Sequence, residues 1–249
     1  MSRVVLITGV AGGIGRATAA VFAEAGWRVV GVDRGADQAP PSVDRYIHAD
    51  ISDVAASRAI FEEVAAGEGR LDALVNNAAI QITKPLVETT PEEWDGVMAS
   101  NLRSVYLGVR HAYPLLRVNG GAIVNVSSVH AIATSANIAA YAASKGALMA
   151  LTRALAIELA SDKIRVNAVL PGAVDTPMLH AGLSRGHVQG STIEELMQGL
   201  ARRTVMGRVG QPAEIGRAIL FLADETLSSF VTGQSLVVDG GATARLSTE

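Results

Sequence analysis

Short runs of aliphatic residues alternate with longer alanine-rich stretches along the whole chain. The runs lack polar alternation, which is typical of strands that are buried on both faces of a parallel sheet. They predict strands over 3–8, 28–33, 45–49, 73–76, 121–127, 165–170 and 235–239. The stretches between them have helical spacing and predict helices over 13–25, 54–66, 91–118, 139–161 and 212–223. Right-handed crossovers then give a doubly wound α/β fold, which binds ligands at the carboxyl ends of its strands.

The alternation breaks once, between residues 179 and 206, where four glycines and mixed charges surround a short helical pattern near 192–201. No repeat or long linker divides the chain, so the sequence predicts a single domain over residues 1–249. The segment at about 178–206 follows a predicted strand end at Pro171 and Gly172. We expect either a lid that folds over a ligand or an ordinary surface loop.

Composition narrows the classes of function. The chain has 249 residues, 49% of them hydrophobic, and a net charge of -3, which gives no electrostatic case for nucleic acid or an anionic membrane. It has no cysteine, and its five histidines lack metal-ligand spacing, so we expect no disulfide, thiol chemistry or metal site. No signal peptide and no apolar run of transmembrane length is recognisable, which predicts a soluble, cytoplasmic protein.

A glycine-rich turn follows the first predicted strand. The sequence TGVAGGIG over residues 8–15 places Gly9, Gly13 and Gly15 between a strand and a helix. Glycines allow close backbone approach, and the free N–H groups of the helix N-terminus favour a pyrophosphate. The spacing is GxxxGxG rather than the GxGxxG of the standard dinucleotide motif. Its position in the first βαβ unit nevertheless predicts dinucleotide binding.

An acidic residue ends the second predicted strand. The carboxylate of Asp33 can accept hydrogen bonds from the adenosine ribose and would repel a 2′-phosphate, which favours NAD over NADP. Gly12, just before Gly13, adds no basic group. Arg34 is the complication, because an arginine here can pair with a 2′-phosphate or stack on adenine. The alternatives are a turn residue for Asp33 and a surface charge for Arg34.

Tyr141 and Lys145 are four residues apart in YAASK, and Ser128 precedes the tyrosine by thirteen. Residues at i and i+4 share a helix face, so the ammonium can stand near the phenol. A unit charge about 5 Å away at an effective dielectric of about 20 contributes roughly 3 kcal/mol, or about two pKa units. Tyrosine, which titrates near about 10, would then approach the range of a general acid or base. Chance spacing on a helix is the alternative.

Together these motifs resemble the classical short-chain dehydrogenase/reductases over nearly the full length of the chain. The matching segments occur in the family's order, and the only departure is alanine in place of the last glycine of NNAG. They are TGVAGGIG at 8–15, NNAA at 76–79, the asparagine of ASNL at Asn101, NVSS at 125–128, YAASK at 141–145 and PGAVDT at 171–176.

The resemblance implies a Rossmann fold with a seven-stranded parallel sheet in the order 3-2-1-4-5-6-7. It assigns the acid/base role to Tyr141, the substrate oxygen to Ser128, and the nicotinamide ribose to Lys145, with Asn101 holding a water for proton relay. Ser128 is preferred to Ser127 because of the separation of thirteen. Asn76 is also expected beside the cofactor. The predicted cofactor residues are Gly9, Gly12, Gly13, Ile14, Gly15, Asp33, Arg34, Asp50, Ile51, Asn77, Ala78, Tyr141, Lys145, Pro171, Gly172, Val174 and Thr176.

Three of these residues have structural alternatives. Asn101 can instead be bonded to backbone, Thr176 can cap a helix before Pro177, and Asp50 can form an Asx turn.

The expected reaction is hydride transfer between NAD(H) and a secondary alcohol or ketone. Polar residues near the motifs favour a polyol, sugar or hydroxy acid as substrate. The candidates, chosen by proximity to the motifs, are Gln81, His130, Asn137, Ala173, Met178 and His180. Two alternatives remain: an NADPH-dependent 3-oxoacyl reductase and a dinucleotide-binding protein without catalysis. The family resemblance also implies a homotetramer, formed through helices 91–118 and 139–161.

Overall fold

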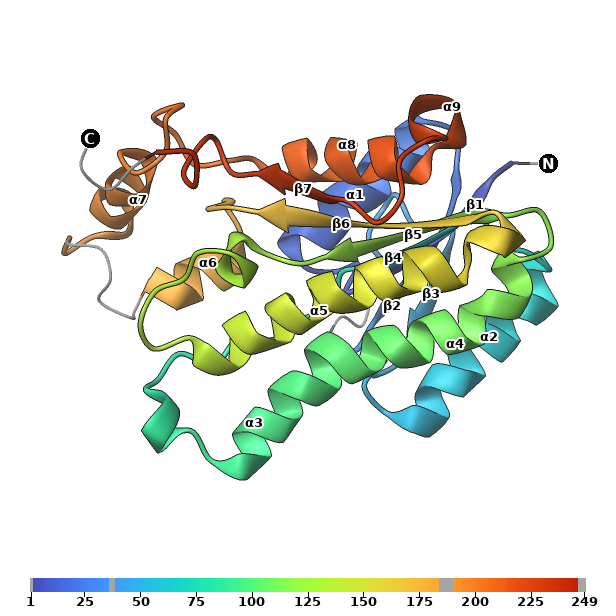
Figure 1. The fold of residues 1–249 in the computed structure, drawn as a ribbon, viewed down its shortest axis with the longest axis horizontal. Helices are drawn as coiled ribbons and strands as arrows, with labels where there is room; N and C mark the ends of the chain where they lie inside the picture. Colours follow the sequence, from blue (N-terminus) through green and yellow to red (C-terminus); the bar gives the residue numbers. More distant parts are fainter. Residues whose placement is uncertain (1, 36–38, 184–189, 246–249) are drawn as a thin grey trace.

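The computed structural model describes residues 2–35, 39–183 and 190–245. Its centre is a parallel seven-stranded sheet with the order β3-β2-β1-β4-β5-β6-β7 (Figure 1). This confirms the predicted architecture and strand order. The strands are β1 (Val4–Thr8), β2 (Arg28–Asp33), β3 (Arg45–His48), β4 (Ala73–Asn76), β5 (Gly121–Val126), β6 (Ile164–Pro171) and β7 (Ser235–Val238).

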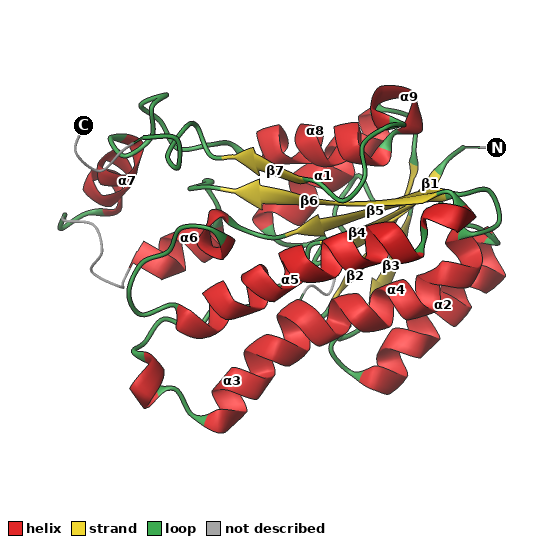
Figure 2. Ribbon diagram, viewed as in Figure 1, coloured by secondary structure: helices red, strands yellow, loops and turns green. Residues whose placement is uncertain are grey.

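Helices cover both faces of the sheet (Figure 2). On one face, α2 (Val54–Glu68), α4 (Ser104–Leu116) and α5 (Ala139–Glu158) bury a core that includes Phe61, Leu116 and Leu148. On the other, α1 (Gly13–Glu24) and α8 (Pro212–Ala223) bury a second core around Phe22 and Ile219. Two buried faces explain why the strands read as unbroken apolar runs.

The helix predicted over 91–118 is wrong as one continuous α-helix. The chain forms α3 (Pro91–Met98), then a π-helical turn over Ala99–Arg103, then α4. A π turn inserts an extra residue without a proline or glycine, so hydrophobic spacing gave no signal for it. Asn101 lies inside this turn and is buried. The turn therefore sets the direction of a predicted catalytic side chain.

The segment predicted as a lid contains two helices, α6 (Pro177–Gly182) and α7 (Ile193–Ala201). The pattern near 192–201 anticipated α7, whereas α6 was not predicted. Residues 184–189 of the segment lie outside the described residues. Leu183 and Leu200 pack together with Leu179 and Val209, so α6 and α7 share a small apolar cluster. A short helix, α9 (Glu225–Ser228), was also not predicted.

A buried polar chain fastens the sheet to α5. Asn76 Nδ2 on β4 donates to Asn125 Oδ1 on β5 at 2.9 Å, and Asn125 Nδ2 donates to Thr152 Oγ1 on α5 at 2.9 Å. Thr152 in turn donates to the carbonyl of Leu148 at 2.8 Å. Buried polar groups are stable only when they are hydrogen-bonded, so this network of hydrogen bonds fixes the position of α5 on the sheet. The Asn76 side chain therefore faces the core, which leaves only its backbone for the predicted place beside the cofactor.

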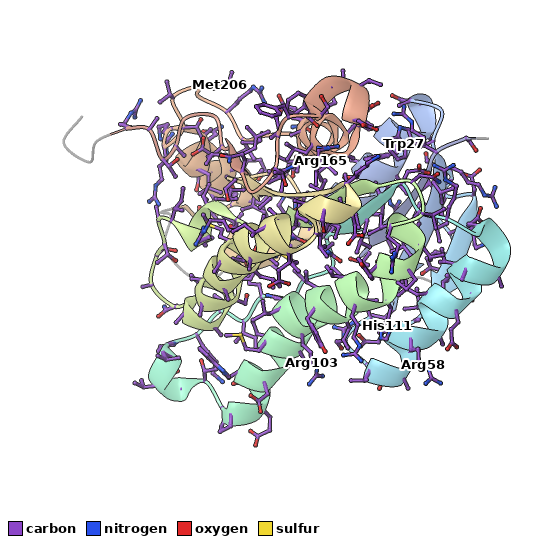
Figure 3. All side chains as sticks on the ribbon, turned by 45° about the vertical axis from the view of Figure 1, so that its right-hand side comes forward. Trp27, Arg58, Arg103, His111, Arg165 and Met206 are labelled. Carbon is purple, nitrogen blue, oxygen red and sulfur yellow. The ribbon has the colours of Figure 1, made fainter. Side chains whose placement is uncertain are left out.

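Arg165 on β6 makes a comparable attachment near α8 (Figure 3). Its guanidinium donates to the carbonyls of Leu222 at 2.7 Å and Ala223 at 3.1 Å, and to the hydroxyl of Ser228 at 3.0 Å. A cation is favourable at the carbonyl end of a helix. Arg165 therefore caps the C-terminal end of α8 and anchors the segment that leads through α9 to β7.

Candidate active site

A cleft lies at the carboxyl ends of the central strands, where a doubly wound fold binds its ligands. It brings together residues from both ends of the chain. Every predicted cofactor residue except Asn76 lines it: Gly9, Gly12, Gly13, Ile14, Gly15, Asp33, Arg34, Asp50, Ile51, Asn77, Ala78, Tyr141, Lys145, Pro171, Gly172, Val174 and Thr176.

The glycine loop has no room for side chains at two positions. Gly9 has φ +68°, and a Cβ on it would lie 2.8 Å from Cα of Ala78. A Cβ on Gly15 would lie 2.1 Å from the carbonyl oxygen of Gly9. Asn77 Nδ2 fastens the loop by donating to the carbonyls of Thr8 at 2.9 Å and Gly9 at 3.0 Å. The loop is thus rigid before any ligand binds.

The N-terminus of α1 opens into the cleft without a side-chain cap. Its N-cap is Gly12, and its first turn carries no acidic residue. Free N–H groups and the positive end of the helix dipole therefore point to the position where a pyrophosphate would lie. On the far side, a Cβ on Gly13 would lie 2.7 Å from Cγ2 of Thr176. The loop geometry and the uncapped helix both fit a dinucleotide.

Two acids and an arginine lie at the end of the cleft where adenosine is expected. Asp33 accepts from the backbone N–H groups of Ala11 and Gly35, both at 2.9 Å. Arg34 Nη1 lies 2.8 Å from Oδ2 of Asp50. Partial burial raises the pKa of Asp50, but hydrogen bonds from Ser52 and Arg34 outweigh it and leave this pKa below its usual value. The arginine predicted as a complication is thus paired with a neighbouring carboxylate.

Three of the four expected catalytic side chains converge deeper in the cleft. Tyr141, Lys145 and Ser128 are 8%, 2% and 6% exposed. Lys145 Nζ lies 5.5 Å from the centre of the Tyr141 ring and donates to the carbonyl of Val126 at 2.7 Å. Burial lowers the pKa of Lys145 to about 8, because it removes water from the ammonium. The lysine stays mostly protonated at neutral pH.

Ser128 is poised as a hydrogen-bond donor. Its Oγ accepts from the backbone N–H of His130 at 3.2 Å. The hydroxyl hydrogen has no acceptor among the described residues, so it remains available for a ligand oxygen. Ser127, by contrast, donates to the carbonyl of Lys145 at 2.9 Å and is used inside the protein. This difference agrees with the choice of Ser128 over Ser127.

Asn101 connects the wall of the cleft with α5. Its side chain accepts from the N–H of Ile80 at 2.8 Å and donates to the carbonyl of Ile80 at 2.9 Å and to Ser144 Oγ at 3.0 Å. Ser144 Oγ donates to the carbonyl of Tyr141 at 2.7 Å. Asn101 itself does not line the cleft. The Asn101 side chain is therefore hydrogen-bonded to the backbone of Ile80, as in the structural alternative given for it.

Thr176 and Asp50 also form the local hydrogen bonds given as their structural alternatives, and both still line the cleft. Thr176 caps α6 by accepting from the N–H of Leu179 at 3.2 Å. Asp50 Oδ1 accepts from the N–H of Ser52 at 2.8 Å, which is an Asx turn. Both side chains line the cleft all the same. Local bonding therefore holds them in place at the ligand surface.

The predicted substrate residues divide into two groups. Gln81, His130 and Met178 line the cleft. His130 Nδ1 lies 3.0 Å from Thr134 Oγ1, and its ring meets the Tyr141 ring edge-on with centroids 6.0 Å apart. Asn137 lies outside the cleft, is exposed, and has φ 62° in the turn that leads into α5. Its prediction as a pocket residue is wrong, because asparagine serves here as a residue that tolerates the left-handed conformation.

Ala173 and His180 also lie outside the cleft. Ala173 packs on the apolar cluster of α6 and α7, and His180 Nε2 pairs with Asp175 Oδ1 at 2.8 Å. Sequence reasoning missed Ile80, Leu179 and Gly182, which line the substrate side. No motif marks them. Their only signal was proximity to the NNAA motif and to the predicted lid.

Within the described ranges, no group of histidines, acids or cysteines is arranged to hold a metal ion. None of the described helices is long and apolar enough to cross a membrane.

Comparison with known proteins agrees with this geometry. A family model described as enoyl-(acyl carrier protein) reductase matches residues 9–243. The chain is 38% identical to the cyclopentanol dehydrogenase of Comamonas sp. over 97% of both chains. It is 38% identical to the 3-oxoacyl-[acyl-carrier-protein] reductase of Thermotoga maritima, over 96% of this chain and 97% of the relative. The solved aldohexose dehydrogenase of Thermoplasma acidophilum superposes with a TM-score of 0.91 at 31% identity, over 99% of this chain and 96% of that one. The chain therefore belongs to the short-chain dehydrogenase/reductases, the nicotinamide-dependent oxidoreductases whose dinucleotide loop and Ser–Tyr–Lys set it contains.

Proposed function

We propose that the protein oxidises a small secondary alcohol, or reduces the corresponding ketone, with NAD(H) as coenzyme. The observation that carries this proposal is the convergence of Ser128, Tyr141 and Lys145 in the same cleft as the dinucleotide loop. A protein that only binds a dinucleotide has no need for a buried lysine beside a tyrosine. Burying an ammonium is costly, so its retention favours a catalytic role.

When bound, the nicotinamide accepts or supplies the hydride. The remaining work belongs to three side chains. Ser128 donates its free hydroxyl hydrogen to the substrate oxygen and fixes it near Tyr141. The Tyr141 phenolate takes the hydroxyl proton during oxidation and returns it during reduction. The Lys145 ammonium, 5.5 Å from the ring centre, stabilises the phenolate by its charge.

The adenosine end supports NAD over NADP. Arg34 is paired with Asp50, so a 2′-phosphate would have to compete with this carboxylate for the guanidinium. Asp33, Arg34 and Asp50 together carry one net negative charge, which opposes a further anion. NADP remains the alternative coenzyme.

The substrate side supports a small polar molecule such as a polyol or sugar. Gln81 and His130 are the polar side chains that line it, beside Met178. Relatives of this chain include dehydrogenases of cyclopentanol and of aldohexoses, both small ring molecules. The runner-up is 3-oxoacyl reduction, because a 3-oxoacyl reductase is as similar in sequence as the cyclopentanol enzyme.

We also propose a homotetramer in which α4 and α5 meet their copies. The outer faces of α3, the π turn, α4 and α5 form a hollow whose lining is mostly aliphatic and alanine side chains, with one acid and one arginine. It is lined by Asp95, Met98, Ala99, Leu102, Arg103, Tyr106, Ala147, Ala150, Leu151 and Ala154. Light scattering at micromolar concentration tests this: a monomer mass contradicts it.

The deciding experiment is turnover by the purified protein with NAD and with NADP. The panel contains cyclopentanol, cyclohexanol, 2,3-butanediol, glucose and a 3-oxoacyl thioester, the last tested in the reducing direction. NAD-dependent turnover of an alcohol is the expected result. Preference for the thioester with NADPH supports the runner-up. Dinucleotide binding without turnover of any compound supports the non-catalytic alternative.

A further inference from the structure

Gln81 stands out on the substrate side because it is half-buried and its amide has no hydrogen-bond partner among the described residues. It lies just beyond β4, next to Ile80, whose backbone Asn101 holds at both its N–H and its carbonyl. Within the described part of the chain, the Gln81 amide makes no hydrogen bond. An amide offers two donors and one acceptor, so bonds unmade in a partly dry cleft favour a polar ligand.

The opposite wall is shaped around this amide. Gly182, near the end of α6, is buried, and a Cβ on it would lie 2.5 Å from Nε2 of Gln81. Gly182 has ordinary helical φ, so glycine is not needed there for the backbone. The missing side chain instead leaves space in which the Gln81 amide lies. Figure 1 shows α6 beside the carboxyl ends of β5 and β6.

The other substrate-side walls near this amide are mainly apolar. Ile80, Met178 and Leu179 line the cleft close to Gln81 and Gly182. Among the described residues of the cleft, the only lysine or arginine side chains are Lys145 and Arg34, at the catalytic centre and the adenosine end. Among the cleft residues that the structure describes, a carboxylate or phosphate on the substrate would find no arginine or lysine near Gln81. A neutral hydroxyl or carbonyl suits an amide among aliphatic side chains.

We propose that Gln81 is a specificity residue that binds a second, neutral oxygen function of the substrate. This rests on the proposed function, since it takes the first oxygen to lie at Ser128 and Tyr141. The substrate is then a compact, mostly aliphatic diol or hydroxyketone, and neither a simple alcohol nor a hydroxy acid. Ile80 and Asn101 position Gln81 through the backbone.

The test compares cyclohexanol with the cyclohexane-1,2-, 1,3- and 1,4-diols by kcat/KM with NAD. The wild type is expected to prefer at least one diol by roughly fivefold to tenfold, the value of one well-placed neutral hydrogen bond. Gln81→Leu keeps the size of the side chain but removes the amide, so this diol-to-cyclohexanol ratio should fall towards one. Gln198→Leu is the matched control, because it removes an exposed amide on α7 outside the cleft, and it should keep the ratio.

A second variant displaces the amide of Gln81 without replacing Gln81 itself. Gly182→Ala adds a methyl that must displace Nε2 of Gln81, while alanine suits a helix better than glycine. The ratio should fall here also, and this variant decides the matter if Gln81→Leu turns over neither alcohol. 4-Hydroxycyclohexanecarboxylate serves as the charged comparator and should not exceed the preferred diol.

The outcomes separate the two proposals. If the wild type oxidises no alcohol with NAD or NADP, the proposed function is contradicted. If it oxidises cyclohexanol but prefers no diol, or if its preference survives in both variants, only the assignment of Gln81 is overturned. A preference for the carboxylate also overturns it.

Discussion

The coenzyme side and the substrate side of the cleft are built differently. On the coenzyme side, backbone contacts fix each element: Asn77 holds the glycine loop, and Asp33 is bonded to two N–H groups. On the substrate side, Met178 is 38% exposed and Gln81 has no hydrogen bond to the described residues. A ligand shared by many enzymes can be recognised by rigid backbone, whereas a particular substrate is recognised by side chains that can be exchanged.

The largest expected effect falls where the two sides meet. Replacing Tyr141 by Phe removes the proton-transferring hydroxyl and should lower kcat by about a thousandfold or more. The aromatic ring remains, so coenzyme affinity measured by fluorescence titration should change little. Retention of more than a tenth of the wild-type kcat would reject Tyr141 as the acid/base.

Rigidity of the coenzyme side can be broken at Gly15. Gly15→Ala places a methyl 2.1 Å from the Gly9 carbonyl oxygen and should destabilise the protein by several kcal/mol without coenzyme. Gly12→Ala is the control in the same loop, because its methyl would lie 3.4 Å from that oxygen. It should unfold near the wild-type urea midpoint and weaken coenzyme binding. Equal midpoints for both variants would show that the loop is not rigid.

Lys145 should make the stability of the coenzyme-free protein depend on pH. Below about pH 8 the lysine is charged in both folded and unfolded chains, so the full cost of burying the charge is present. Between about 8 and 10.5 only the unfolded chain keeps the proton, so the stability of the wild type rises with pH. Lys145→Met lacks this rise. Its stability relative to the wild type should therefore fall across that window, by about 3 kcal/mol at most.

Urea unfolding of both proteins from pH 7 to 10.5, without coenzyme, measures this difference. A difference that is constant with pH would mean that burial does not lower the pKa of Lys145. With coenzyme and substrate, the same variant should be almost inactive and should bind NAD more weakly.

The basis of coenzyme choice can be tested at Asp33. Asp33→Asn removes the charge that repels a 2′-phosphate and should shift the NAD-to-NADP ratio of kcat/KM by roughly tenfold, about 1.4 kcal/mol, towards NADP. Arg34→Ala is the companion variant, and because Arg34 is already paired with Asp50 it should shift the ratio less. If only Arg34→Ala changes the ratio, another charge arrangement governs selectivity.

The smallest effect is expected at Asn137, outside the cleft. Asn137→Gly keeps the positive φ without a side chain and should change the free energy of unfolding by less than about 1 kcal/mol. KM for every alcohol should stay at the wild-type value. A clear rise in KM would show that Asn137 contributes to substrate binding.

The difference between the two sides also decided what the sequence could predict. Strand order, the glycine loop, Asp33 and the Ser–Tyr–Lys set were recognisable because backbone geometry and proton chemistry restrict the residues allowed there. The π turn at Asn101 and the helix α6 left no periodic signal. Asn137 misled because asparagine suits both a polar pocket and a left-handed turn. Gln81 could be named as a candidate, but its contact with Gly182 joins segments a hundred residues apart.

The parallel sheet has a consequence for how the enzyme is made. Each of its six strand pairings joins segments that are separated by a crossover. The central strand β1 can form its hydrogen bonds on both edges only after β2 and β4 are in place. No hairpin joins the described strands of this sheet, and each parallel pairing requires a long loop to close first, so folding is expected to be slow. The cleft needs β1, β4, β5 and β6 together, so regained activity during refolding would report the last stage of assembly rather than the first.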